Sequence, residues 1–337
     1  MGERVRVGLL GCGRIGKMHA DLLATRIDGA SLAAGYDVVP DAARASGEPY
    51  GATVAATPEE LIADPSVDAI AICSSTDTHI DLLVAAADTG KPVFIEKPLS
   101  LDLADVERGV AAVKRSGISV QVGFNRRFDA SHRAVRDRVA AGDVGDVHLV
   151  RITSRDPAPP PIAYIEVSGG IFCDMTIHDF DMARFVTGSE VVQVHAVGAV
   201  RVDPAIGEAG DLDTVVVTMI HENGAITTID NSRQAVYGYD QRVEVFGSKG
   251  LAASENPYTT TTVVRDASGS RHDTIPYFFI DRYIPSYVAE WEAFVSMVRD
   301  GAPSPVTIDD GRAPLLLGLA AWRSVREGRP VKVDEIA

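Results

Sequence analysis

The segment Gly11-Cys12-Gly13-Arg14-Ile15-Gly16 constrains the fold of this chain most, because it directly follows an apolar run at residues 5–10. The G-x-G-x-x-G spacing is typical of the turn between the first parallel strand of a dinucleotide-binding domain and the next helix. The three glycines permit a tight turn, a close approach to a pyrophosphate and close helix–strand packing, and the helix dipole favours the phosphates. The spacing is also compatible with an ordinary glycine-rich turn.

A second expected strand, residues 31–37, ends in a carboxylate. Asp37 lies 21 residues after Gly16, near the position at which an acidic side chain binds the ribose hydroxyls of a dinucleotide. Residues 38–40 contain no cation, which favours NAD over NADP, and Arg44 is the nearest basic residue that could weaken this preference. An ordinary turn residue at the end of a strand is the alternative for Asp37.

Length and composition set the outer limits. A chain of 337 residues is long enough for two domains with sizeable cores. The formal net charge of −15 argues against nucleic acid or an anionic membrane as a partner, because both require clustered cations. No apolar run reaches the roughly 18 residues of a membrane span, and no signal peptide is evident. The three scattered cysteines predict a cytoplasmic protein without a zinc framework.

The first part of the chain, residues 1–122, alternates short apolar strands with helices. This alternation predicts a doubly wound parallel sheet, that is, an NAD-binding Rossmann domain. The expected strands are residues 5–10, 31–37, 67–73, 92–95 and 118–122, and the expected helices are residues 18–24, 78–89 and 103–115.

The second part, residues 123–337, has longer strands with polar and apolar residues in alternation. Turns at residues 223–224 and 247–250 predict antiparallel hairpins. The expected strands are residues 147–153, 191–200, 214–220, 225–230, 242–246 and 259–264, and the expected helices are residues 285–299 and 312–326. The fold class is therefore α/β, with an N-terminal Rossmann domain followed by an α+β domain on an open-faced, mainly antiparallel sheet. Because its strands are too apolar for a face in water, we expect another subunit to cover that sheet.

One candidate site follows the expected strand at residues 92–95, at Glu96-Lys97-Pro98. Ligands of open α/β sheets bind at the carboxyl ends of the strands, so Lys97 is well placed for a bound nicotinamide. A surface lysine in a turn is the alternative. The bond between Lys97 and Pro98 is a candidate cis peptide bond. We also expect Ser74, Thr76 and His79 near the cofactor, with a helix-cap role as the alternative for His79.

A second candidate site is the segment 174–181. If it is one helix, then Asp174, His178 and Asp181 share a face at positions i, i+4 and i+7, and the surrounding apolar residues predict burial. A histidine beside a carboxylate is a tunable proton acceptor near neutral pH. A helix-capping Asp174 with an interior histidine is one alternative. A metal site is another, which the lack of a further soft ligand disfavours.

Together these segments resemble the Gfo/Idh/MocA family of NAD(P)-dependent sugar and polyol dehydrogenases, and within it the bacterial inositol 2-dehydrogenase branch. The resemblance spans nearly the whole chain, with one departure at residues 74–76, where relatives often carry proline. The matching segments are residues 11–16, 96–99, 123–129, 154–159, 169–172 followed by Asp174 and His178, 237–241 and 281–283.

The resemblance implies a reaction: NAD-dependent oxidation of myo-inositol to 2-keto-myo-inositol (scyllo-inosose) in inositol catabolism, by a homotetramer without a metal. It implies a catalytic triad of Lys97, Asp174 and His178. The implied cofactor contacts are Gly11, Gly13, Arg14, Ile15, Gly16, Asp37, Ser74, Thr76, His79, Glu96 and Lys97. The implied substrate contacts are Lys97, Arg127, Asp156, Asp174, His178 and Tyr239, with Asp281 and Arg282 as further candidates.

Several alternatives stay open. Each of the outer substrate contacts could be an ordinary salt-bridge or surface residue. The substrate could be another inositol isomer, an aldose or an anhydrosugar. A non-catalytic dinucleotide sensor could use the same fold, although the intact triad argues against it. His19, on the first helix, is expected to be structural.

Overall fold

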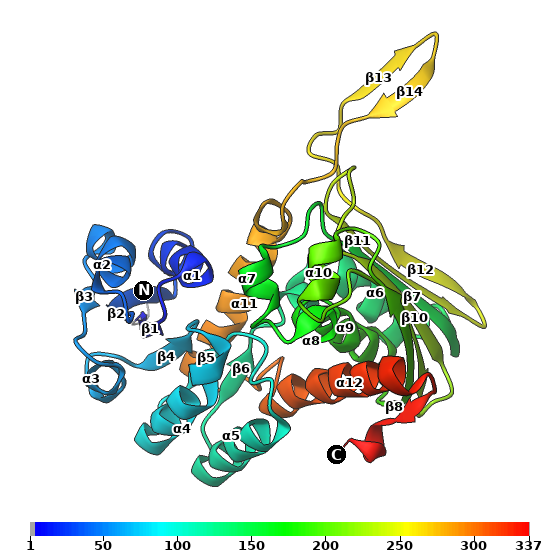
Figure 1. Cartoon of the computed structure of the whole chain (residues 1–337). Helices are drawn as coiled ribbons and strands as arrows, with labels where there is room; N and C mark the ends of the chain where they lie inside the picture. Colours follow the sequence, from blue (N-terminus) through cyan, green and yellow to red (C-terminus); the bar gives the residue numbers. More distant parts are fainter. Residues whose placement is uncertain (1–3, 337) are drawn as a thin grey trace. The chain divides into compact units, whose positions relative to one another are not determined.

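The computed structural model describes residues 4–336, which divide into two compact units (Figure 1). Unit 1 runs to Asn125 and also contains Tyr287–Ala313, whereas unit 2 contains Arg126–Ser286 and the chain from Pro314. This division differs from the expected boundaries of 1–122 and 123–337. The returning segment belongs to unit 1 because its aromatic side chains pack in the core there, with Trp291 stacked on Phe94 at a ring-centroid distance of 4.6 Å.

Unit 1 is built on a six-stranded parallel sheet with the order β3-β2-β1-β4-β5-β6. The strands are β1 (Val5–Leu10), β2 (Ala30–Tyr36), β3 (Thr53–Val54), β4 (Ala69–Ile72), β5 (Val93–Ile95) and β6 (Val120–Val122). The helices are α1 (Arg14–Thr25), α2 (Pro40–Gly47), α3 (Pro58–Ala63), α4 (His79–Thr89) and α5 (Leu103–Ser116), with 3-10 turns η1 (Glu48–Tyr50) and η2 (Thr76–Thr78).

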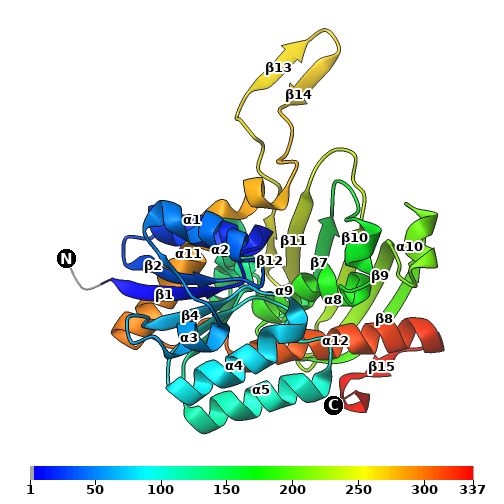
Figure 2. The same ribbon diagram turned by 60° about the vertical axis from the view of Figure 1, so that its left-hand side comes forward.

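The two faces of this sheet are both covered. Helices α1 and α2 lie on one face, and α4 and α5 lie on the other (Figure 2). Every residue of β4 is consequently buried, which explains its continuous apolar sequence. The doubly wound parallel sheet predicted from the sequence is confirmed, and β3 is an additional short strand.

Two long helices, α11 (Phe279–Asp300) and α12 (Ile308–Glu327), carry the chain between the units. Both begin earlier than predicted, because Pro285 and Pro314 lie inside them and not at their starts. A proline removes one internal hydrogen bond without ending a helix that is packed on both sides of it. Neither these helices nor any other within residues 4–336 combines the length and apolarity of a membrane-crossing segment.

Unit 2 is built on a seven-stranded sheet with the order β12-β11-β7-β10-β9-β8-β15. The strands are β7 (Val147–Arg155), β8 (Val191–Ala199), β9 (Thr214–His221), β10 (Ile226–Ser232), β11 (Asp240–Gly247), β12 (Gly250–Ser254) and β15 (Val331–Lys332). The sheet is mixed but mainly antiparallel, because β10 pairs with β7 in parallel and the other pairs are antiparallel.

The remaining elements of unit 2 differ in part from the prediction. The strand expected at residues 259–264 is replaced by a separate hairpin of β13 (Val263–Asp266) and β14 (Gly269–His272), which extends away from the sheet (Figure 1). The helices are α6 (Ala130–Ala140), α7 (Ile162–Ile165), α8 (Gly170–Asp174), α9 (Ile177–Thr187) and α10 (Pro204–Glu208), with 3-10 turns η3 (Asn125–Phe128) and η4 (Val333–Glu335).

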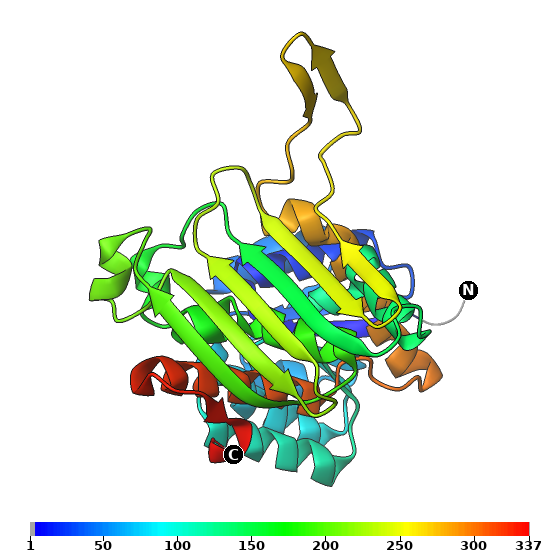
Figure 3. The same ribbon diagram turned by 90° about the vertical axis from the view of Figure 1, so that its right-hand side faces the viewer.

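One face of the seven-stranded sheet is packed and the other is open. Apolar residues of α6, α8, α9 and α12 form one buried cluster with the inward side chains of the sheet. Along β9 the inward Val215 and Val217 are buried, whereas the outward Val216 is 47% exposed. Within the described residues 4–336, no helix covers the outward face (Figure 3). The open-faced sheet predicted from the sequence is therefore confirmed.

The core of unit 1 contains a fully buried carboxyl group, Glu290 of α11. Neither of its side-chain oxygens has a hydrogen-bond partner among the described residues. Gln121 donates from its side-chain amide to the main-chain oxygen of Glu290 over 2.8 Å. Burial raises the pKa of Glu290 well above its ordinary value, and the negative charge of Glu96 raises it further. The fold therefore favours the uncharged form of Glu290.

We predict that Glu290→Gln changes the pH dependence of stability. Above the ordinary carboxyl pKa of 4.5 the unfolded wild type releases a proton that the folded chain keeps, so wild-type stability falls as the pH rises toward the raised native pKa. The amide does not titrate. In urea denaturation, the free energy of unfolding of the variant should therefore rise relative to that of the wild type from pH 5 to pH 8, by up to about 1.4 kcal/mol per pH unit.

Glu292→Gln, on the exposed side of the same helix, is the matched control and should follow the wild-type pH dependence. A Glu290→Gln curve parallel to the wild type would contradict a protonated Glu290.

Candidate active site

The glycine motif of unit 1 forms a tight cradle at the end of β1. Gly11 has φ +93°, and a Cβ atom there would lie 2.4 Å from the backbone nitrogen of Ser74. A Cβ atom at Gly16 would lie 1.9 Å from the carbonyl oxygen of Gly11, so α1 can approach the turn only with glycine at this position. At Gly13 a Cβ atom would meet nothing within 4 Å. The first and third glycines therefore serve the turn and the packing, and Gly13 faces open space.

The start of α1 suits an anion. Gly13 is its N-cap, no described side chain caps it, and its first turn holds no acidic residue. A phosphate at this helix start would be favoured by the helix dipole and by the backbone N–H groups of the first turn. This combination fits the pyrophosphate of a dinucleotide.

Asp37 is fixed at the end of β2 by two backbone donors. Its Oδ2 accepts from the N–H of Cys12 over 2.7 Å, and its Oδ1 accepts from the N–H of Val39 over 2.8 Å. The carboxylate therefore lies beside the glycine turn, as ribose binding requires. Arg44 is paired with Asp41, so the nearest cation in sequence is already neutralised by a carboxylate. These residues fit NAD.

The loops after β4 and β5 are joined by His79. Its Nδ1 lies 2.9 Å from the carbonyl oxygen of Pro98, and its Nε2 lies 3.1 Å from the carbonyl oxygen of Ser74. The ring is buried, and this burial lowers the pKa of His79. Ser74 is also hydrogen bonded to Thr78, over 2.7 Å between the two hydroxyl oxygens. His79 thus binds the two loops together through backbone carbonyls, and a direct cofactor contact stays a prediction.

The backbone of Lys97 is held by a buried network of aromatic and charged groups. The indole N–H of Trp291 donates to His19 Nδ1 over 2.9 Å, so Nε2 of this histidine carries the proton and donates to Glu96 over 2.9 Å. The second oxygen of Glu96 accepts from the N–H of Lys97 over 3.2 Å. The Lys97–Pro98 bond is cis, as expected. His19 is structural in this arrangement, and Glu96 links it to the candidate catalytic lysine.

In unit 2 the segment 174–181 is not one helix. Helix α8 ends at Asp174 and α9 begins at Ile177, so the expected i, i+4, i+7 stripe is interrupted. The intervening Thr176 donates from its hydroxyl to the side chain of Asn231 on β10 over 2.6 Å. That contact fixes the turn between the two helices.

Asp181 is separate from this candidate site, because it forms a two-pronged buried ion pair with Arg127, with N–O distances of 2.8 and 2.6 Å. The guanidinium of Arg127 also lies 5.3 Å from the centre of the Phe185 ring. Both contacts give Arg127 a structural role, and its proposed contact with substrate stays a prediction.

Asp174 has donors on both carboxylate oxygens. Tyr164 donates from its hydroxyl to Oδ1 over 2.7 Å, and Arg233 donates to Oδ2 over 3.1 Å. Arg233 is buried and its other amino group donates to Asp211 over 3.1 Å. Sequence reasoning missed Tyr164, Arg233 and Asp211. The signal for Arg233 was its place directly after the polar end of β10, residues 230–232.

Asp156 and Tyr239 lie in the same polar region as Asp174. Burial raises the pKa of Asp156 to about 6, and the negative charge of Asp174 adds to this rise. Arg126 lies 3.4 Å from the Tyr239 hydroxyl and is paired with the buried Asp179 over 2.6 Å. A carboxyl group and a phenol of this kind can exchange hydrogen bonds with the hydroxyls of a polyol.

The two outer candidates behave differently. Arg282 is buried and paired with Asp129 over 2.5 Å, whereas Asp281 is exposed. Within residues 4–336 no group of three or more His, Cys, Asp or Glu side chains could hold a metal ion.

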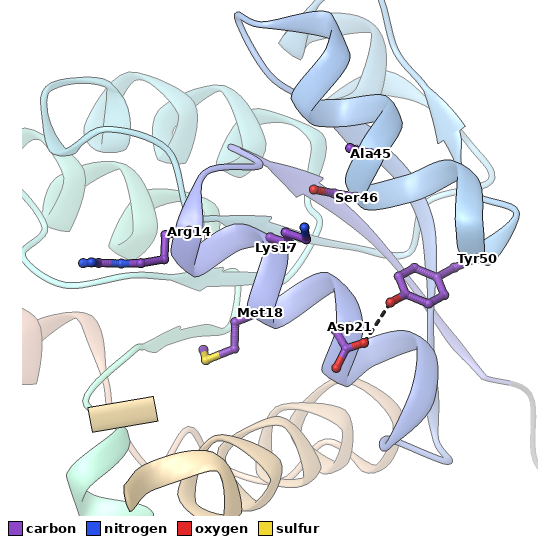
Figure 4. Close-up of a pocket in the computed structure, with 7 residues that line it drawn as sticks. All are labelled: Arg14, Lys17, Met18, Asp21, Ala45, Ser46 and Tyr50. Carbon is purple, nitrogen blue, oxygen red and sulfur yellow. Dashed lines mark hydrogen bonds between the residues drawn. The ribbon is translucent and has the colours of Figure 1, made fainter. Parts of the chain in front are cut away.

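Two open pockets lie beside helices of the two units. One, of about 290 Å³ in unit 1, is lined by α1, α2 and Tyr50 (Figure 4). Tyr50 donates to Asp21 across it over 2.8 Å, and the Arg14 side chain extends away from both (Figure 4). The other, of about 580 Å³, lies between α6 and β12 in unit 2. Neither pocket is lined by Asp37, Asp174 or His178.

Comparisons with known proteins agree with a dinucleotide-binding fold for unit 1. Residues 5–124 match the profile of an oxidoreductase family with an NAD-binding Rossmann fold, and residues 132–253 match the GFO/IDH/MocA C-terminal domain. The chain is 51% identical to the myo-inositol 2-dehydrogenase of Thermotoga maritima, over 98% of this chain and 99% of that protein.

Two solved structures are similar over 98% of this chain. One is described as a myo-inositol dehydrogenase from Sinorhizobium meliloti, with a TM-score of 0.94, 46% identity and 99% of that chain covered. The other is a scyllo-inositol dehydrogenase from Lactobacillus casei with bound NAD(H) and scyllo-inositol, with a TM-score of 0.92, 30% identity and 100% of that chain covered.

Proposed function

The chain belongs to the GFO/IDH/MocA family of oxidoreductases, and we propose that it is an NAD-dependent dehydrogenase that oxidises myo-inositol to 2-keto-myo-inositol (scyllo-inosose). The observation that carries the proposal is the 51% identity with a myo-inositol 2-dehydrogenase along 98% of this chain. That similarity covers both the glycine cradle and the segment with Asp174 and His178. An oxidoreductase of this kind would serve inositol catabolism.

NAD, when bound, supplies the hydride acceptor. The cradle of Gly11, Gly13 and Gly16 would hold its pyrophosphate on the first turn of α1. Asp37 would accept hydrogen bonds from the adenosine ribose, and a 2′-phosphate at that position would be repelled by the carboxylate. The remaining proposed contacts are Arg14, Ile15, Ser74, Thr76, His79, Glu96 and Lys97.

Three residues would carry the proton chemistry. His178 takes the proton of the reacting hydroxyl, and the Asp174 carboxylate stabilises the imidazolium that results. Lys97 donates a hydrogen bond to the reacting oxygen and stabilises the negative charge that develops there. The network of Glu96 and His19 supports this role, because it fixes the backbone at Lys97.

The other hydroxyls of the polyol would meet Asp156, Tyr239 and Arg127. Asp156 can donate or accept, since its pKa of about 6 lies close to neutral pH. Another inositol isomer is the second candidate substrate, and the 30% identity with a scyllo-inositol dehydrogenase supports it. The reaction belongs in a reducing compartment, the cytoplasm, because all three cysteines are buried free thiols.

The open sheet face supports association with further copies of the chain, a dimer or a tetramer, and the family resemblance favours a homotetramer. Five apolar side chains on it form one row, because Leu251 pairs with Phe246, Phe246 with Leu149, Leu149 with Ile226, and Ile226 with Ile220. They cross five neighbouring strands and are each between 38% and 53% exposed. A contiguous apolar row of this length in water favours association, and closed symmetry favours a second copy of the same sheet as its cover.

We predict that the protein reduces NAD in the presence of myo-inositol. Absorbance of NADH at saturating substrate should give a kcat/KM at least about tenfold higher with NAD than with NADP, because of Asp37. Asp37→Ala should narrow this preference. A panel of inositol isomers, aldoses and anhydrosugars identifies the preferred substrate. Absence of turnover with every member would favour a dinucleotide sensor.

The same assay tests the base. The kcat/KM for myo-inositol should rise with pH through one ionisation with an apparent pKa of roughly 6.5–8.5, because only neutral imidazole accepts a proton. His178→Ala should remove this rise and lower kcat/KM by about 10²-fold or more. If the variant keeps both the rise and most of its activity, the base lies elsewhere and Lys97 is the first alternative.

We predict that the protein is a tetramer at micromolar concentration. Light scattering should report four copies of the 35.8 kDa chain. Phe246→Glu together with Leu149→Glu places two like charges in the middle of the apolar row and should shift the protein to smaller species. Thr218→Glu, away from the row on the same face, is the milder control. A wild-type mass of one chain would refute the proposal.

A further inference from the structure

The proposed mechanism gives no role to Arg233, a charged residue directly after β10. Its side chain is 1% exposed and lies between two carboxylates of unit 2. One amino group donates to Asp174 Oδ2 and the other to Asp211 Oδ2, each over 3.1 Å. Such a fork fixes both partners in direction as well as in distance.

Asp211 binds the other end of the Arg233 guanidinium, so Arg233 forms a bridge between Asp174 and Asp211. Its Oδ1 accepts from the backbone N–H of Ile171 over 2.9 Å, in the first turn of α8. Gly170 has φ +75°, and a Cβ atom there would lie 2.7 Å from the same carboxylate oxygen. Asp211 is therefore pressed against the start of the helix whose last residue is Asp174. The bridge holds this one-turn helix at both ends.

Arg233 is the cation that compensates the negative charges of Asp174 and Asp211. Cys173 lies beside both carboxylates, and burial raises its pKa to about 12, so it is uncharged at neutral pH. Tyr164, on α7, donates to Asp174 as a neutral phenol. Asp156, at the end of β7, adds negative charge near Asp174, and the positive charge of Arg126 lowers the pKa of Asp156. Without Arg233, the carboxylates of Asp174 and Asp211 would lose the cation that lies between them, and their like charges would be left uncompensated.

We propose that Arg233 is a positioning residue for the base: it orients the Asp174 carboxylate toward its role beside His178 and compensates its charge, and Asp211 fixes the guanidinium in place. This inference rests on the proposed function of His178. Arg233 does not touch the reacting atoms in this account. It acts through Asp174.

The test compares pH profiles of kcat/KM for myo-inositol in the full chain. Arg233→Gln should lower kcat/KM at pH 7 by about 10²-fold, because Asp174 is no longer oriented, and move the acidic limb upward by about one pH unit, because the negative charges of Asp174 and Asp211 lose their cation and stabilise the imidazolium more strongly. Adding Asp211→Asn to this variant should restore part of the loss, about tenfold, and return the limb toward the wild-type position, because one of the two uncompensated carboxylates is gone.

Two further variants keep the test decisive if Arg233→Gln does not fold. Arg233→Lys retains the charge but reaches one carboxylate at a time, so kcat should fall about tenfold with the limb within half a pH unit of the wild type. Arg184→Gln removes an arginine of α9 that is paired with Glu190, and it should leave the limb unchanged.

The outcomes separate the inference from the proposed function. NMR titration of the His178 imidazole in the wild type and in Arg233→Gln needs no turnover. The midpoints of the two titrations should differ by about half a pH unit or more. If the wild type does not oxidise inositol but this difference is present, the substrate assignment fails and the inference stands. If Arg233→Gln loses activity with both the limb and the imidazole titration unchanged, or if Arg233→Lys moves the limb as far as Arg233→Gln does, Arg233 is merely structural and the inference is overturned.

Discussion

The close approach of α1 to the turn after β1 is the constraint on which the rest of the account depends. A Cβ atom at Gly16 would come within 1.9 Å of the Gly11 carbonyl, so the helix can start here only because that side chain is absent. No side chain caps the start of α1, and the N–H of Cys12 in the same turn holds Asp37. The glycine motif thereby fixes the local fold of unit 1 and forms the turn that we propose for the dinucleotide.

Buried charges are paired around each candidate catalytic group. In unit 1, Trp291 and His19 orient Glu96, which holds the backbone at Lys97. In unit 2, Arg233 and Tyr164 hold Asp174 from opposite oxygens. Uncompensated buried charge is costly, so such networks favour one arrangement of the groups they contain. This organisation suits a reaction whose rate depends on the direction of a proton acceptor and of a hydrogen-bond donor.

The sequence predicted those features of the structure that depend on residues close together in the chain. The glycine turn, Asp37, the parallel sheet and the open sheet face all follow from short-range spacing. The break between α8 and α9 did not, because the Thr176 hydroxyl is held by Asn231, 55 residues away. Arg233 is 59 residues from Asp174, and His19 is 272 residues from Trp291, so neither contact leaves a periodic signal. The helices around Pro285 and Pro314 extend further because tertiary packing outweighs one missing hydrogen bond.

The most direct test of the central claim follows the transferred hydrogen. With myo-inositol deuterated at C2, the account predicts that the label appears in the reduced nicotinamide, detected by mass spectrometry, together with a primary isotope effect on the chemical step. Release of the label into water, or its retention in the inositol while NAD is reduced, would contradict oxidation by direct hydride transfer.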